Sequence, residues 1–186
     1  MRKTVAAFLV FLLCYSPGLL AQNKSPFQKP GTGPEWAKLG FLAGTFTTET
    51  HLSPNRMSPN GSVGKGNASL TWGVDSVYLL LDDQSLDQVM GQYRAHGVLG
   101  YSAREGKYTL AMFNNFGDTP RYTGSFSGDT LIMTSKVEFP GGSFDQKLVW
   151  YKEGKNLRLK IYNDMGKGPM MAIDQIQTPV VADATK

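Results

Sequence analysis

After its first quarter, the sequence is a succession of short segments in which apolar and polar side chains alternate. Leu157, Leu159 and Ile161 share one parity, and Arg158 and Lys160 share the other. Successive side chains of a β-strand point to opposite faces, so this pattern is typical of strands with one face turned inward. The same region lacks the apolar stripe of an amphipathic helix. The pattern therefore indicates an all-β fold.

Short loops that contain glycine separate these segments. Gly128-Asp129, Glu153-Gly154 and Pro140-Gly141-Gly142 are typical of β-hairpin turns. The pattern predicts strands at 44–52, 66–72, 76–82, 85–91, 93–101, 107–115, 121–127, 130–138, 143–152, 156–163 and 170–178. A meander of about ten strands is too large to stay open easily, and closure removes its edges. We predict an all-β fold, a single antiparallel up-and-down β-barrel of about ten strands, lipocalin-like, with a short N-terminal helix.

The helix is expected just before the first strand. Pro34 suits the first turn of a helix, Glu35 follows it, and Gly40 is expected to end the helix after Leu39. The predicted organisation is a signal peptide, a linker, a barrel domain and a C-terminal tail, at residues 1–21, 22–34, 35–178 and 179–186.

The first 21 residues have the composition of a secretory signal peptide. Arg2 and Lys3 form a positive n-region, Val5 to Leu13 form an apolar h-region, and Ala21 offers a small residue for cleavage. The alternative is an N-terminal helix buried in the fold. We expect a periplasmic or secreted protein.

Cys14 is the only cysteine of the chain and lies inside the predicted signal peptide. A lipoprotein would need a small residue before its lipidated cysteine, and Leu13 is large. The exported domain is therefore expected to contain no thiol that could form a disulfide, attack a substrate or bind a metal.

Charge and hydropathy exclude two classes of partner. The formal net charge is only +4 and the basic residues are scattered, so the sequence has no electrostatic footprint for nucleic acid. No apolar run reaches the roughly 20 residues of a membrane-spanning helix. We expect neither a nucleic-acid partner nor an integral membrane protein. A homodimer is left open.

Local motifs for catalysis or metal binding are absent from the sequence. The chain has two histidines, too few for a three-histidine zinc site. Asp82, Asp83 and Asp87 lack the spacing of a calcium-binding loop. The segment Gly124 to Gly128 has Phe126 where a nucleophile elbow needs serine. We predict no catalytic residue and no metal ligand.

Three segments resemble known family patterns. Leu42 to Phe46 resembles the Leu-x-Gly-x-Trp opening of calycin barrels, with Phe46 in place of tryptophan. Residues 97–117 resemble the central signature of the bacterial DUF1579 family, and Trp72 followed by Tyr78-Leu79 resembles its second block. The central matches are Gly100, Tyr101, Lys107, Tyr108 and Gly117, and the departures are Met112, Asn114, Asn115 and Phe116.

The DUF1579 resemblance covers about residues 39–178 and implies a barrel related to lipocalins, fatty-acid-binding proteins and nitrobindins. It also implies a small apolar ligand, and the family has no established activity. Nitrobindin-like barrels are thought to hold haem through a histidine late in the chain. This sequence has no histidine after His96, so that mode is disfavoured and we expect no cofactor.

The favoured function is non-catalytic binding of a small hydrophobic or amphipathic ligand inside the barrel. The residues predicted to line the cavity are Phe46, Trp72, Tyr78, His96, Tyr108, Met112 and Trp150. One alternative is a filled barrel that serves as a protein-interaction module. Another is an enzyme acting on a lipid-like molecule, with Asn114 or His96 as polar participants. We also predict that Phe46 stacks with Arg158 at the closed end of the barrel.

Overall fold

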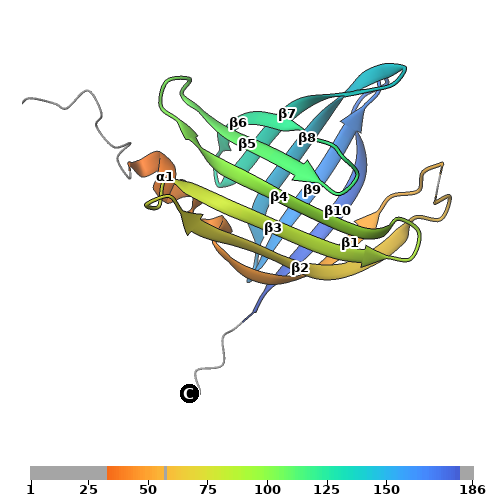
Figure 1. Cartoon of the computed structure of the whole chain (residues 1–186), viewed down its shortest axis with the longest axis horizontal. Coiled ribbons are helices and arrows are strands. Elements are labelled where there is room, and N and C mark those ends of the chain that lie inside the picture. Colours follow the sequence, from red (N-terminus) through yellow and green to blue (C-terminus); the bar gives the residue numbers. More distant parts are fainter. Residues whose placement is uncertain (1–32, 57, 181–186) are drawn as a thin grey trace, which may run out of the picture.

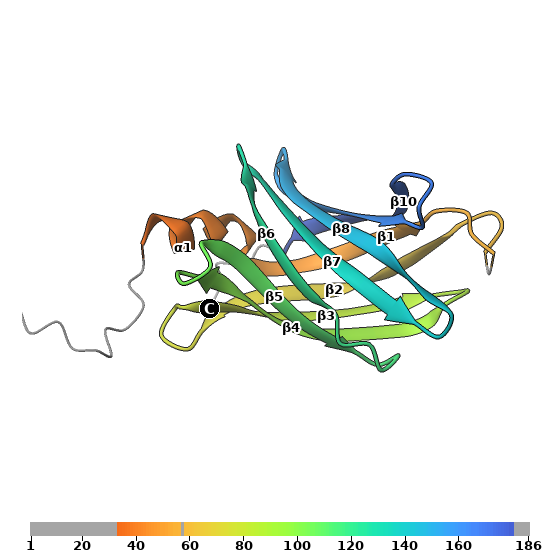
Figure 2. The same cartoon turned by 90° about the horizontal axis from the view of Figure 1, so that it is seen from above.

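Ten antiparallel strands close into a barrel in a computed structural model that describes residues 33–56 and 58–180 (Figures 1 and 2). The predicted fold class is confirmed. The predicted signal peptide, residues 22–32 of the linker and residues 181–186 of the tail lie outside the described residues. The elements are α1 (Pro34–Lys38), the 3-10 helix η1 (Leu39–Leu42), β1 (Gly44–Leu52), β2 (Ser62–Gly73), β3 (Tyr78–Asp87), β4 (Gly91–Ser102), β5 (Lys107–Asn114), β6 (Arg121–Ser127), β7 (Thr130–Phe139), β8 (Gly142–Glu153), β9 (Asn156–Asp164) and β10 (Met170–Pro179).

The first and last strands close the barrel. Each strand pairs with its neighbour in sequence, and β1 pairs with both β2 and β10. The β1–β10 register runs from Phe46 opposite Pro179 to Leu52 opposite Ile173. Every strand therefore has two partners, and the described sheet has no open edge.

One predicted strand does not form, because β3 is a single strand that ends at Asp87. Residues 88–90 form a turn in place of the predicted continuation to residue 91. The Asp87 Oδ1 atom accepts hydrogen bonds from the backbone N–H groups of Val89 at 2.7 Å and Met90 at 2.8 Å. An aspartate that bonds to its own following backbone favours a turn over an extended strand.

The helical segment continues past the predicted end. Leu39–Leu42 forms a 3-10 turn that includes Gly40. Leu39 and Leu42 are fully buried against the barrel end, so packing keeps the chain helical through the glycine. The Trp36 indole Nε1 donates a hydrogen bond to the Val77 carbonyl at 2.9 Å.

The helical segment and aromatic side chains fill one end of the barrel. The Tyr108 hydroxyl donates a hydrogen bond to the Glu35 carbonyl at 2.9 Å, which fixes α1 to β5. The buried core comprises Leu39, Leu42, Phe46, Leu70, Leu79, Leu81, Leu99, Tyr108, Leu110, Tyr122, Leu131, Met133, Leu148, Trp150, Leu157 and Leu159. We call the end that α1 and η1 cover the closed end, and the opposite end the mouth.

The predicted stack of Phe46 on Arg158 does not form. Phe46 is buried inside the barrel, whereas Arg158 lies between the inward-facing Leu157 and Leu159 and so projects outward. Its guanidinium donates to both carboxylate oxygens of Asp174, at 2.6 and 2.7 Å. The sequence pattern places Arg158 on the outer face, and that parity decides the contact.

Candidate ligand cavity

A cavity of about 670 Å³ occupies the mouth half of the barrel. Its volume lies within the range of pockets that hold small organic ligands. Apolar residues from nearly every part of the barrel line it, among them Leu70, Leu81, Met112, Val137, Phe144, Leu148, Trp150, Leu159, Ile161 and Ile173.

Small side chains on β2 leave part of this space free. Gly64 and Ala68 face the interior, where larger residues would fill it. Both residues are buried. Lys65, which lies between Gly64 and Gly66 in the sequence, points outward and is exposed. In the closed half of the barrel, leucines and aromatic rings fill the interior, so the cavity is confined to the mouth half.

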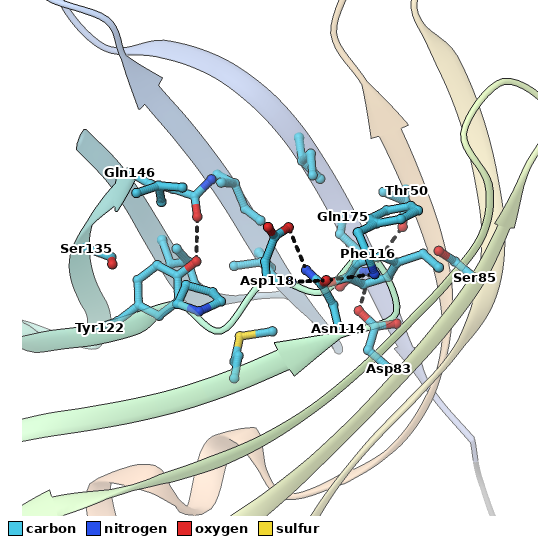
Figure 3. Close-up of a pocket in the computed structure, with 18 of the residues that line it drawn as sticks. Thr50, Asp83, Ser85, Asn114, Phe116, Asp118, Tyr122, Ser135, Gln146 and Gln175 are labelled. Atoms are coloured by element: carbon cyan, nitrogen blue, oxygen red, sulfur yellow. Dashed lines mark hydrogen bonds between the residues drawn. The ribbon is translucent and has the colours of Figure 1, made fainter. Parts of the chain in front are cut away.

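A chain of amide hydrogen bonds crosses one wall of the cavity (Figure 3). The Gln177 Nε2 donates to Gln175 Oε1 at 2.6 Å. The Gln175 Nε2 donates in turn to Thr50 Oγ1 at 3.0 Å and to Asp83 Oδ2 at 3.3 Å. These residues come from β10, β1 and β3, so the chain forms only in the closed barrel.

Asp83 is an acid held inside this wall. Burial raises its pKa to about 6, and the hydrogen bond from Gln175 opposes that shift. Its second oxygen, Oδ1, is buried and has no hydrogen-bond partner among the described residues. Burial, followed by the charge of Asp83, raises the pKa of Tyr93 to about 12. Near neutral pH the wall therefore carries a carboxylate with a free acceptor and a protonated phenol.

A second polar group lies across the cavity on β6, β8 and β9. The Tyr122 hydroxyl donates to Gln146 Oε1 at 2.5 Å (Figure 3). The Gln146 Nε2 donates in turn to Asn163 Oδ1 at 2.9 Å. Burial raises the pKa of Tyr122, which keeps its hydroxyl protonated as a donor. The Tyr122 hydroxyl and the Gln146 side-chain amide therefore both have hydrogen-bond partners.

Asn114 shapes the loop between β5 and β6 at the mouth. Its Oδ1 accepts hydrogen bonds from the backbone N–H groups of Phe116 at 3.0 Å and Asp118 at 3.1 Å. Its Nδ2 donates to Asp118 Oδ2 at 3.3 Å (Figure 3). These bonds hold the side chains of Phe116 and Asp118 against the cavity, which they both line.

Besides Asp87 Oδ2, two further buried polar atoms on the wall lack partners within the described part of the chain. They are the indole Nε1 of Trp150 and the Oε1 of Gln177. Trp150 is 2% exposed and Gln177 is 3% exposed. Leaving such groups unpaired is costly, so a ligand that pairs with them would gain affinity.

The structure brings two of the seven predicted lining residues into the cavity. Met112 and Trp150 lie on its wall. Phe46 and Tyr108 are buried in the core of the closed end. The three others, Trp72, Tyr78 and His96, lie outside the cavity.

Strand parity explains these outward positions. His96 lies between the buried Ala95 and Gly97, so it projects outward and pairs with the exposed Asp82. Tyr78 covers Gly100 on the outer face, where its ring lies in the place of the missing side chain. Trp72 is 37% exposed near the end of β2.

The polar wall is the part of the site that sequence reasoning missed. Asp83 and Gln175 sit at positions whose parity matches buried neighbours such as Leu81 and Gln177. A polar residue at an inward position of a predicted strand is the signal that could have identified them. Their meeting across three strands depends on barrel closure and register.

Residues 33–56 and 58–180 contain no group of three or more His, Cys, Asp or Glu side chains placed to hold a metal ion. No helix in that part of the chain has the length and apolar character needed to cross a membrane.

Fold and cavity together define a closed antiparallel barrel with an open mouth. Among solved structures, the chain is similar to the crystal structure of Rv2717c from M. tuberculosis, with a TM-score of 0.59. The two share 14% sequence identity, and the match covers 80% of this chain and 99% of that chain. This likeness supports the fold alone. Comparison of the sequence with models of known families gives no match, and neither does comparison with curated protein sequences.

Proposed function

We propose that this protein binds a small amphipathic molecule inside the barrel and does not transform it. The observation that carries the proposal is the cavity of about 670 Å³, with an apolar wall and a polar wall. An apolar group would contact Trp150, Met112 and Leu148, and a polar group would reach the Asp83–Gln175 side. Such pockets usually combine extensive apolar lining with a few placed polar groups.

The open cavity speaks against a filled barrel that acts only through its outer surface. A filled barrel would carry large side chains at the inward positions of β2, where this chain has Gly64 and Ala68. We regard the interaction module as the weaker alternative for this reason.

We further propose that the chain is a DUF1579 protein exported to the periplasm or beyond. The supporting residues are those that match the family signature between Gly100 and Gly117, together with the signal-like N-terminus. Met112, Asn114 and Phe116 depart from that signature and line the cavity. The ligand is therefore expected to depend on residues particular to this chain.

The cavity can be tested with a fluorescent apolar probe, diphenylhexatriene, whose emission rises when it leaves water. We expect saturable emission with the wild-type protein and its loss in Ala68→Phe, because the added ring would occupy the cavity. Thr71→Phe on the same strand points outward and is the matched control, expected to bind as the wild type does.

Thermal melting of both variants checks that they remain folded. Absence of saturable binding by the wild-type protein, or equal binding by folded Ala68→Phe, would overturn the proposal.

A further inference from the structure

The charged side chains of the cavity wall differ in depth. Arg121, Lys136 and Glu138 are exposed at the mouth, whereas Asp83 and Asp87 are not. The Asp87 Oδ1 atom accepts two backbone N–H groups of its own turn, and its Oδ2 is buried without a partner among the described residues. Asp83 accepts no backbone N–H group, and its printed partner is the Gln175 side chain, so of the two buried acids it is the one that its own backbone does not hold.

The hydrogen bonds around Asp83 leave acceptors unused. Gln177 donates to Gln175, and Gln175 donates to Asp83 Oδ2. Because both amides donate towards Asp83, no donor among the described residues reaches Gln177 Oε1 or Asp83 Oδ1. Gln177 is 3% exposed, so water has little access to its amide. A ligand that supplies N–H groups would satisfy what this wall lacks.

Aromatic rings line the same cavity as the acid. Tyr93, Tyr122, Phe144 and Trp150 all line the cavity. Aromatic faces attract cations, and a carboxylate beside them strengthens that preference. No buried cation on the described wall competes for Asp83, because the basic side chains lie at the mouth.

We propose that the ligand is an amphipathic amine, with its protonated nitrogen on Asp83 and its apolar part against Trp150 and Met112. This proposal rests on the proposed function and names the chemical class of its ligand. The nitrogen donates to Asp83 Oδ1 and, where it carries further hydrogens, to Gln177 Oε1. A charge-assisted hydrogen bond of this kind is stronger than one between neutral groups.

The amine preference depends on the ionisation of Asp83. The other titratable or charged groups of the wall are Asp87 on the same strand, Tyr93 on β4, Asp118 in the β5–β6 loop, and Tyr122 and Arg121 on β6, with Lys136 and Glu138 on β7. The pKa of Asp83 is raised to about 6, so its charge is lost in a mildly acidic range in which the tyrosines stay protonated.

The test compares decylamine, decan-1-ol and decanoate as competitors of bound diphenylhexatriene at pH 7.5. We expect decylamine to bind about tenfold or more tightly than decan-1-ol, and decanoate to bind most weakly. Asp83→Asn should abolish the difference between the amine and the alcohol while it preserves alcohol binding. Asp82→Asn changes the neighbouring, outward-facing carboxylate and should preserve the amine preference.

The results separate this proposal from the one on which it rests. Equal amine preference in the wild type and Asp83→Asn, or tightest binding of decanoate, would overturn the amine assignment and leave the cavity function intact. Failure of the wild type to bind the probe or any competitor would overturn both. Below pH 6 the wild-type preference should decline, and a constant preference down to pH 5 would also contradict the role of Asp83.

Discussion

Asp83 shows how a single inward side chain can give a barrel its chemistry. It occupies a strand position whose parity belongs to the interior, and its carboxylate is held by Gln175 from the opposite end of the chain. Burial disfavours its charged form, which raises its pKa to about 6. Such a position weakens the fold at neutral pH, and a ligand that pairs with the charge would recover that loss.

The raised pKa of Asp83 predicts a pH dependence of stability. The folded state binds the proton more tightly than the unfolded chain, whose aspartates have a pKa near the ordinary value of 3.8. The free energy of unfolding should therefore fall as the pH rises from about 4 to about 6. Because Asp83 is partly accessible through the cavity, we expect a loss of at most about 2 kcal/mol.

Urea unfolding of the wild type and Asp83→Asn at pH 5 and pH 7.5 measures this effect. The variant should lack the loss, and the difference between the two proteins should grow towards pH 7.5. Asp87 and Asp174, whose pKa values are lowered, act below about pH 4 and are common to both proteins. Parallel profiles for the two proteins would refute the assignment.

Within the strands, glycines allow neighbouring backbones to approach closely, in addition to their place in the turns. A Cβ atom at Gly124 on β6 would overlap the carbonyl oxygen of Ile132 on β7. Gly66 on β2 has the same relation to Gln84 on β3. In both cases, the neighbouring strand approaches too closely for a side chain. The glycine content of the sequence is therefore only partly explained by hairpin turns.

Gly124→Ala tests this close approach. The added methyl group would push β6 away from β7, and we expect the free energy of unfolding to fall by about 2 kcal/mol or more. Gly40→Ala is the matched control, because a Cβ atom there meets open space. Urea unfolding should show a change within about 0.5 kcal/mol for the control. A Gly124→Ala protein as stable as the control would contradict the packing argument.

The sequence predicts best those strands whose apolar–polar alternation and flanking turn residues both indicate the same strand boundaries. The strands around Leu131 and Leu157 alternate cleanly and end at glycine-containing hairpins, and they form as expected. The extension to residue 91 was wrong because the Asp87 side chain bonds to its own backbone and turns the chain. That contact outweighs the strand propensity of Val89, and period alone does not report it.

For the whole molecule, closure could be predicted but the cavity wall could not. A long meander favours closure because closure removes free edges. Which residues meet inside the barrel depends on strand register. Asp83 on β3 meets Gln175 on β10 because β1 pairs with both β10 and β2, which brings β10 near β3. Trp72 and Tyr78 are predicted to line the cavity but project outward, whereas the pleat places Asp83 and Gln175 inside.

The proposed export can be tested directly. A full-length protein expressed in a bacterium should be recovered outside the cytoplasm, with Gln22 at its N-terminus. Leu9→Arg interrupts the apolar run from Val5 to Leu13 and should abolish export. Thr4→Arg adds the same charge to the n-region and should preserve it. N-terminal sequencing of fractionated cells measures both, and cytoplasmic retention of the wild type would contradict export.

The pairing of β1 with β10 also fixes where the described chain begins and ends. Phe46 lies opposite Pro179, and the backbone N–H of Val180 donates to the Thr45 carbonyl at 2.9 Å. Both ends of the described chain therefore leave the barrel at the end that α1 covers, away from the mouth (Figure 1). A tether attached at either end would leave the mouth facing solution, so the cavity of an immobilised molecule would stay accessible.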